Sequence, residues 1–332
     1  MSETLVTVVI VPRERFSETE RSLESILERT KFPHELVYVD GGAPAGIRRY
    51  LAHRAASRGF RLIRHDRYLT PTQARNIGWR AATTPYVVFV DNDVVVTPGW
   101  LDALVRCAEE TGAWMVTPAI CIGSPPADEV HMAGGRAYIH LQNGRRILSE
   151  KHGYAGQSLA DARPKMQRER TELVEFHTVL VRRNLFDRLG PLDEGLMSTR
   201  EHVDLSLAVQ GAGGTIYFEP ESVVTYVPPP PFAWSDYGYY LLRWSEAWNL
   251  ASLKHFRGKW DLGQDDPQLT DQARWLREHR HIALAPMAKS LRKVVGEMPA
   301  AAIIKHAVAP LEVLLNRLFL RTRPSLSAPK TP

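Results

Sequence analysis

Short apolar runs alternate with helical segments over the first 120 residues of the chain. The run from Leu5 to Val11 (LVTVVIV) and the run from Tyr86 to Val90 (YVVFV) are rich in β-branched residues, which is typical of strands buried on both faces of a parallel sheet. Strands are predicted over residues 5–11, 36–39, 60–64, 86–90 and 114–120, and helices over residues 18–28, 47–57, 72–82 and 100–111. Strands that alternate with helices form right-handed βαβ units. The pattern therefore predicts an α/β fold with a mostly parallel sheet flanked by helices.

The second half of the chain is less regular. Residues 144–171 are polar and rich in Arg, Lys and Gly, so we expect a long loop there. Strands are predicted over residues 173–181 and 215–218, and a helix over residues 204–210. Four consecutive prolines at positions 228–231 cannot lie inside a helix or a sheet. They predict a boundary between a domain over residues 1–230 and a helical extension over residues 231–332.

The composition is that of a globular protein. Hydrophobic residues make up 44% of the 332 residues and charged residues 24%, which excludes a disordered, collagen-like or coiled-coil chain. The two cysteines, Cys107 and Cys121, lie in apolar surroundings without the spacing of metal ligands, so we expect them to be reduced core residues of a cytoplasmic protein. The first residues do not form a basic segment followed by a long apolar stretch, and we expect no secretory signal.

Positive charge is concentrated near the C-terminal end. The formal net charge is +5, but residues 286–332 carry eight Lys or Arg against two Glu, which gives +6 there and −1 elsewhere. Residues 300–320 interleave apolar positions with basic ones such as Lys305 and Arg317. A basic amphipathic helix of this kind suits the anionic inner face of a membrane. The alternative is a helix packed on the main domain with its basic face in solvent.

Two further classes of function are disfavoured. The chain has no uninterrupted hydrophobic run of 18 or more residues, which argues against a membrane-embedded synthase. Its basic residues are not interleaved with aromatic ones, and no nucleic-acid-binding motif occurs. We therefore expect no nucleic-acid partner.

An acidic triplet, Asp91-Asn92-Asp93, directly follows the strand that ends at Val90. Asp40 holds the equivalent position after the strand that ends at Val39. Ligands of open α/β sheets bind beyond the carboxyl ends of the strands, so the two acidic positions indicate one binding edge. Carboxylates two residues apart can hold Mg²⁺ or Mn²⁺ together with the phosphates of a nucleotide. The alternative is a turn with solvated acids, because Asp and Asn favour turns.

Several segments resemble those of the family 2 glycosyltransferases and occur in the same order. They are Val6–Pro12 (VTVVIVP), Val39–Gly41 (VDG), Ala74–Gly78 (ARNIG) and Tyr86–Asp93 (YVVFVDND). Gly190–Glu194 (GPLDE) followed by Glu201–Leu205 (EHVDL) is similar to the family's later G-x-x-D-E and E-D-x-D-L motifs. The resemblance covers residues 5–227. It implies the GT-A fold and a metal-dependent, inverting transfer of a sugar from a nucleoside-diphosphate sugar to a hydroxyl of a carbohydrate or lipid-linked acceptor.

The resemblance also implies donor-binding roles outside the triplet. Asp40 is expected to accept a hydrogen bond from the base of the nucleotide, and Pro12 to line the same pocket. Arg75 and Asn76 are expected beneath the ribose and phosphates of the donor. The structural alternatives are that Pro12 only ends a strand and that Asn76 only caps a helix or packs.

Within the triplet, the resemblance makes Asp93 a direct ligand of Mn²⁺ or Mg²⁺. Asp91 is expected to contact the ribose or the metal and its water, and Asn92 to belong to the donor site. The family often adds a His after its last core strand, but residues 223–227 (VVTYV) contain none. Either the chain has no third protein ligand, or His202 or His177 takes that role, and these alternatives stay open.

Inverting transfer needs a base that removes the proton of the attacking hydroxyl. The family uses the acidic residue of its E-D pair, whereas this chain has His202 at that position. Glu201, one residue earlier, and His202 itself are the preferred candidates. Asp204 is the third, although an acid in a first helical turn more often organises the helix start. A metal-ligand role or a packed polar role for His202 are further alternatives.

Two other functions compete with glycosyl transfer. A sugar nucleotidyltransferase would share the α/β fold, the acids and Mg²⁺, but it should carry a Gly-rich loop after the first strand, and Val11–Arg15 (VPRER) has no glycine. A non-catalytic nucleotide-sugar-binding protein is the third hypothesis, and the departure at His202 favours it. The sequence does not identify the sugar, the nucleotide or the acceptor, because we expect those contacts from loops such as residues 123–172.

Overall fold

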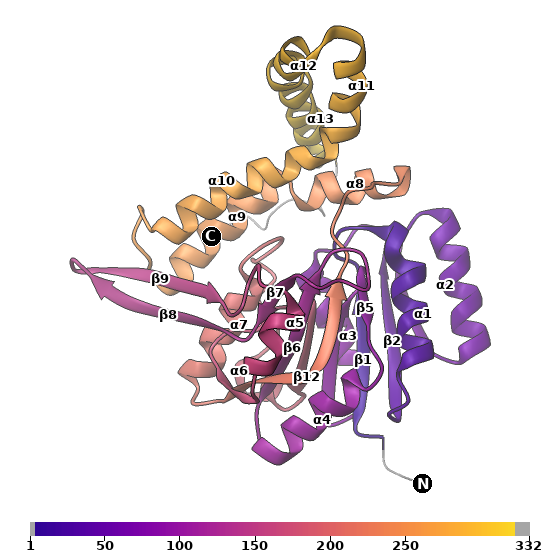
Figure 1. The fold of residues 1–332 in the computed structure, drawn as a ribbon, viewed down its shortest axis with the longest axis vertical. Helices are drawn as coiled ribbons and strands as arrows, with labels where there is room; N and C mark the ends of the chain where they lie inside the picture. Colours follow the sequence, from indigo (N-terminus) through magenta and orange to yellow (C-terminus); the bar gives the residue numbers. More distant parts are fainter. Residues whose placement is uncertain (1–3, 323–332) are drawn as a thin grey trace.

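A twisted central sheet organises the computed structural model, which describes residues 4–322 (Figure 1). Its main path runs β10-β12-β6-β11-β4-β1-β2-β3, with β5 paired to β12 and β7 paired to β6. The strands are β1 (Val6–Val11), β2 (His34–Gly41), β3 (Arg61–His65), β4 (Tyr86–Asp91), β5 (Val94–Val96), β6 (Met115–Ile122), β7 (Val130–Ala133), β10 (Glu169–Thr171), β11 (Thr178–Arg182) and β12 (Ile216–Tyr226). Strands β3, β2, β1 and β4 are parallel to one another, whereas β11 runs antiparallel between β4 and β6. The predicted mostly parallel α/β sheet is confirmed, and the β-branched runs form its centre.

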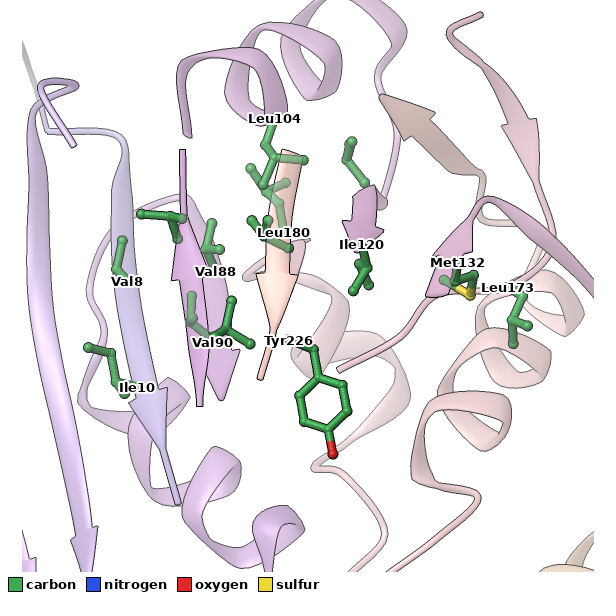
Figure 2. Packing of buried hydrophobic residues seen from close by; sticks show 14 of the residues in the cluster. Val8, Ile10, Val88, Val90, Leu104, Ile120, Met132, Leu173, Leu180 and Tyr226 are labelled. Carbon is green, nitrogen blue, oxygen red and sulfur yellow. The ribbon is translucent and has the colours of Figure 1, made fainter. Parts of the chain in front are cut away.

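Helices cover both faces of this sheet. They are α1 (Thr19–Arg29), α2 (Ala45–Arg58), α3 (Pro71–Ala81), α4 (Trp100–Thr111), α6 (Leu185–Leu189) and α7 (Glu201–Gly211), and a short helix, α5 (Leu159–Ala162), precedes β10 in the chain. Neighbouring residues of a strand point to opposite faces, so Val8 and Val88 pack against α1 and α4, while Val9 packs against α3. Figure 2 shows the first of these layers, where Val8 and Val88 lie in the same cluster as Leu104.

Two local features of the sequence set the position of α3. Thr70 and Gln73 form a capping box at its N-terminus, and Pro71 occupies the first turn, where its missing N–H costs nothing. Farther along, Gly78 lies so close to β1 that a Cβ atom there would be 2.1 Å from a methyl of Val9. Glycine therefore lets α3 lie directly on the sheet, which holds Arg75 near the strand ends.

Residues 144–171 are not a long loop, so this prediction was wrong. Strands β8 (Gly135–Gln142) and β9 (Arg145–His152) form a two-stranded antiparallel ribbon that extends from the main sheet (Figure 1). The turn residues Asn143 and Gly144 have φ of 51° and 74°, and Asn-Gly is the sequence that favours such hairpin turns. The overall polarity of the segment concealed this signal. The strand predicted over residues 173–181 is also shorter, because it begins only at Thr178.

Beyond β12, the described chain is helical. The helices are α8 (Trp234–Arg243), α9 (Glu246–Trp260), α10 (Pro267–His281), α11 (Ala285–Val295), α12 (Glu297–Ile303) and α13 (Ala309–Arg321). Helices α9 and α10 lie above the ribbon, where Leu148 N donates to Asp266 Oδ2 at 2.8 Å, while α11–α13 project farther from the sheet (Figure 1).

The projecting helices carry an apolar surface that the sequence analysis underestimated. Helix α12, a π turn at Ile304–Val308 and α13 run on as one helical segment, Glu297–Arg321. Its most apolar 18-residue window has a mean hydropathy of 1.4 and is only 11% buried, so its length and composition are those of a helix that can cross a membrane. The search for an uninterrupted apolar run missed it, because Lys305 lies inside the segment.

Candidate functional site

The ends of β1 and β4 lie side by side, because Val11 pairs with Asp91 in the parallel register. Strand β11 is antiparallel to β4, so the residue before it reaches the same edge, and Asp91 N donates to His177 O at 3.1 Å. Asp91, Asp93 and His177 thus form one buried group whose potential ligand atoms all lie within 4.8 Å of one another. We call this group the triplet cluster. Of the two open alternatives for a third ligand, His177 is the residue that lies beside the acidic triplet.

The triplet cluster has the orphaned polar atoms that a cation would satisfy. Among residues 4–322, neither carboxylate oxygen of Asp93 nor Nδ1 of His177 has a hydrogen-bond partner, although both side chains are buried. Unpaired buried carboxylates are costly, and burial raises the pKa of Asp93 well above its ordinary value. Burial also lowers the pKa of His177, which favours the neutral imidazole that binds metals. Two carboxylates and one imidazole fit a divalent ion.

Two arginines flank Asp91. Arg75 Nη2 on α3 lies 2.6 Å from Asp91 Oδ1, and Arg13 Nε, just past β1, lies 3.1 Å from Asp91 Oδ2. The Arg75 guanidinium stacks 4.1 Å from the ring centre of Phe176, and that of Arg13 lies 4.8 Å from the ring centre of Tyr226. Asp91 is therefore tied by cations, whereas Asp93 has both oxygens free for a ligand. The sequence analysis missed Arg13, although its position directly after Pro12 places it at the binding edge.

Asp40 and Pro12 also lie at this edge. Asp40 is 1% exposed at the end of β2, accepts from Ala43 N at 2.8 Å and forms an ion pair with Arg64 on β3. The carbonyl of Pro12 accepts from Tyr239 Oη on α8 at 3.4 Å, so the C-terminal helices touch this edge. Both residues lie at the ends of neighbouring parallel strands, and the partner Arg64 was not anticipated.

Asn92 and Asn76 hold loops together. Asn92 Oδ1 accepts from Arg13 N at 2.9 Å, and its Nδ2 donates to Arg15 O at 2.9 Å, which fixes the loop after β1. Asn76 pairs with both backbone groups of Leu192 at 2.9 Å. This pair of hydrogen bonds fixes the G-P-L-D-E segment to α3. Both asparagine side chains thus form their hydrogen bonds with other groups of the described chain.

The three candidate bases at the start of α7 have different surroundings. Glu201 Oε1 lies 3.7 Å from Arg75 Nη1, and its other oxygen is buried without a hydrogen-bond partner among the described residues. Asp204 instead accepts from Lys259 and from Trp260 Nε1, each at 2.8 Å, so it joins α7 to α9. One side chain, Arg75, therefore connects Glu201 to the triplet cluster.

His202 faces a different group of residues. Its Nε2 lies 3.5 Å from Glu150 Oε1 on β9 and 3.4 Å from Glu175 Oε1. Burial opposes a charged imidazole here, but the carboxylates of Glu175 and Glu150 raise the pKa of His202 above its ordinary value. His202 therefore does not join Asp93, and the metal-ligand alternative that paired these two residues is not supported by their positions.

Comparison with known families finds a match for the N-terminal part of the chain. A profile described as Glycosyl transferase family 2 matches residues 7–162. Residues 7–162 are a family 2 glycosyltransferase domain. The match contains Asp40, Arg75 and the acidic triplet, whereas His177 and the start of α7 lie beyond it.

Individual proteins are similar to a larger part of the chain that carries the family 2 domain. Human polypeptide N-acetylgalactosaminyltransferase 9 is 25% identical over 272 residues, which is 78% of this chain and 44% of that protein. The structure of GalNAc-T7 with UDP, GalNAc and Mn²⁺ superposes with a TM-score of 0.55 at 19% identity, covering 83% of this chain and 56% of that one. A mannosyltransferase from Pyrobaculum calidifontis with GDP-Man and Mn²⁺ gives a TM-score of 0.52 at 18% identity over 98% and 86% of the two chains. These likenesses confirm the GT-A fold. The chain spans less than half the length of the first curated relatives that it matches.

Proposed function

We propose that this protein transfers a sugar from a nucleoside-diphosphate sugar to a hydroxyl acceptor, with inversion and with Mn²⁺ or Mg²⁺. The observation that carries the proposal is the triplet cluster, in which two buried carboxylates and a histidine converge at the carboxyl edge of a family 2 domain. The two similar structures are complexes with UDP or GDP-Man and with Mn²⁺, which favours glycosyl transfer over nucleotidyl transfer. A bound divalent ion would neutralise the diphosphate leaving group.

Asp93 and His177 would hold the metal, with Asp91 as a further ligand or as the partner of its water. Arg75 and Arg13 keep Asp91 in place by their contacts of 2.6 Å and 3.1 Å. Arg13 is partly exposed and is the cation best placed to reach the donor phosphates. Asp40, paired with Arg64, would recognise the base. Asn92 and Asn76 would act as positioning residues, because protein groups occupy their side chains.

We further propose Glu201 as the catalytic base. Glu201 contacts Arg75 at 3.7 Å, and one of its oxygens has no hydrogen-bond partner among the described residues, so it is free to accept a proton. His202, the other preferred candidate, lies between two carboxylates that favour its protonated form, and a protonated imidazole cannot accept a proton. Asp204 is held by Lys259 and Trp260, which suits a residue that organises α7.

The C-terminal helices would bring the catalytic domain to its acceptor. We propose that residues 1–230 form the catalytic domain and residues 231–332 an extension that binds the anionic cytoplasmic face of a membrane. Exposed leucines lie along one side of α13, at positions 311, 314, 315 and 318, with exposures between 47% and 57%. A cavity of about 410 Å³ beside α13 is bordered by Arg277, His281, Lys305 and Arg317 among others. Apolar surface next to basic groups suits an anionic bilayer, where a lipid-linked acceptor would lie.

A ligand screen tests the proposed donor site. Ligands that bind only the folded state raise its apparent stability, so UDP, GDP, TDP and CDP sugars are compared by thermal shift with and without Mn²⁺. We expect one nucleotide class to raise the melting temperature strongly only when Mn²⁺ is present, and Asp40→Ala to reduce that shift. If no nucleotide sugar stabilises the protein in either condition, the proposed function is wrong.

A further inference from the structure

A second group of potential ligands lies beside the triplet cluster and is not used by the proposed function. Glu150 and His152 are two residues apart on β9, so their side chains point to the same face of the ribbon. His202, in the first turn of α7, meets them there, and the three potential ligand atoms lie within 4.8 Å of one another. We call this group the hairpin cluster. We propose that it is a second metal site, for Zn²⁺ or a similar transition-metal ion.

The distances within the hairpin cluster fit a shared cation better than direct hydrogen bonds. Glu150 Oε1 lies 3.4 Å from His152 Nε2 and 3.5 Å from His202 Nε2. Good N–H···O bonds are about 2.7–3.2 Å long, so both contacts are stretched. Two ligands of a tetrahedral Zn²⁺, each about 2.0–2.1 Å from the ion, are about 3.4 Å apart. Both contacts of Glu150 thus have the spacing of a coordination shell, and all three ligand atoms lie within 4.8 Å of one another.

The ligand types indicate a different ion from that of the triplet cluster. Two imidazoles and one carboxylate are the His₂Glu set of open zinc sites, and imidazole ligands favour transition metals over Mg²⁺. Glu175 Oε1, 3.4 Å from His202 Nε2, adds a second negative charge beside the group. The set therefore offers both ligands and negative charge to a divalent ion, whose binding would displace the proton from His202.

Neighbouring residues hold the carboxylate in place. Arg200 forms an ion pair with the second oxygen of Glu150, which leaves Oε1 directed toward the two histidines. Arg200 has φ of 71° at the position before α7, a strained conformation for a residue other than glycine. Outer residues that orient a ligand in this way are typical of metal sites.

The hairpin cluster is also accessible, unlike the triplet cluster. The side chains of Glu150, His152 and His202 are 12%, 24% and 14% exposed, whereas those of Asp91 and His177 are 0% and 1% exposed. An ion there would keep an open position for a water or a hydroxyl oxygen.

His131 separates the two clusters. The centre of its ring lies 5.3 Å from that of His152 and 5.3 Å from that of His177. The ions of a two-metal centre are about 3.5–4 Å apart, which leaves no room for a ring between them. We therefore infer two separate single-ion sites at neighbouring positions, one for the donor and one that faces solvent.

Zinc binding by the full chain tests this inference without any sugar transfer. The protein is stripped with a chelator and titrated calorimetrically with Zn²⁺, and bound metal is counted by mass spectrometry. We expect His152→Ala and His202→Asn each to lose one equivalent of Zn²⁺, or to bind it at least about 100-fold more weakly, since loss of an outer residue alone costs 10–100-fold. His140→Ala, an imidazole loss on the same ribbon, is the matched control and should bind like the wild type.

Cobalt gives an independent readout. Co²⁺ in a tetrahedral site absorbs visible light, and we expect this absorption to be lost in His152→Ala and kept in Asp93→Asn. If His202→Asn does not fold, His152→Ala decides alone, with circular dichroism as the folding check. The inference would be wrong if His152→Ala bound Zn²⁺ with the stoichiometry and affinity of the wild type. It would also be wrong if Asp93→Asn removed all Zn²⁺ binding. Neither result depends on the outcome for the proposed sugar transfer.

Discussion

The carboxyl edge of the sheet and the C-terminal helices distribute polar and apolar groups in opposite ways. At the sheet edge, Asp91 and Asp93 are 0% exposed. On α13, Leu311 and Leu315 are 55% and 57% exposed. Burying charge is costly unless a partner compensates it, and exposing leucine is unfavourable unless another surface covers it. The proposed partners of the two regions therefore differ in kind: a cation with its nucleotide at the sheet edge, and a lipid surface at the helices.

The largest effect is expected from the buried carboxylate without a partner. Asp93→Asn removes the charge but keeps the shape, so the metal and the donor diphosphate lose their anchor. We expect turnover to fall at least about 10³-fold, since metal stabilisation of the leaving group supplies several kcal/mol. Sugar release from the donor found in the thermal-shift screen measures this. Asp187→Asn, on the surface of α6, is the control. Equal turnover in the two variants would mean that the buried acid Asp93 matters no more to the reaction than an exposed one.

A second test separates the two neighbouring candidates for the base. Glu201→Gln should lower kcat by about 10²–10⁴-fold, the usual contribution of a general base, while the donor still binds with Mn²⁺. His202→Asn should reduce kcat much less, because its contacts are with Glu150 and Glu175. Single-turnover rates with a fixed donor measure both. The reverse order of effects would show that the base is His202.

The exposed leucines provide the matching test for the helical region. Leu314→Asp combined with Leu315→Asp should weaken binding to anionic vesicles at least about 100-fold, because burial of each leucine contributes about 1.5–3 kcal/mol. Vesicle flotation measures the binding, and donor binding in solution should stay unchanged. Leu141→Asp, at a site on the ribbon that is 74% exposed, controls for a general loss of apolar surface. Equal vesicle binding by wild type and the double variant would mean that another partner covers α13.

The smallest effect is expected where α7 meets α9. Asp204→Asn weakens the contacts to Lys259 and Trp260, and hydrogen bonds to charged groups contribute about 1.5–3 kcal/mol. We expect the free energy of unfolding, measured by chemical denaturation, to fall by about this amount. The loss of turnover should be far smaller than that of Glu201→Gln. A turnover loss as large as that of Glu201→Gln, with unchanged stability, would make Asp204 the base instead.

Much of the fold was predictable because the central strands are uninterrupted apolar runs. Helix α4 has the predicted bounds, and the edge with Asp40 and the acidic triplet follows from parallel strand order alone. The ribbon was missed because its residues are polar and its main sequence signal is a single Asn-Gly turn. The helix near the C-terminal end was expected over residues 300–320, but its full apolar length was missed because Lys305 and Glu312 interrupt the apolar run.

The composition of the site was less predictable than its location. His177 meets the triplet because β11 runs antiparallel beside β4, a pairing that no local pattern encodes. His202 instead contacts Glu150, which reaches it from the ribbon, and this partner too is distant in the sequence. The sequence placed Arg13 directly after a strand but did not indicate that it pairs with Asp91. Long-range pairing, rather than local spacing, decides these partners.

The central claim is that Asp93 and His177 hold the divalent ion that binds the donor. Its most direct test is calorimetric titration of Mn²⁺ into the protein saturated with the nucleotide found in the screen. We predict one tight Mn²⁺ site in the wild type and in Asp187→Asn, and loss of that site in both Asp93→Asn and His177→Ala. A tight nucleotide-dependent Mn²⁺ site that survives in Asp93→Asn would contradict the account.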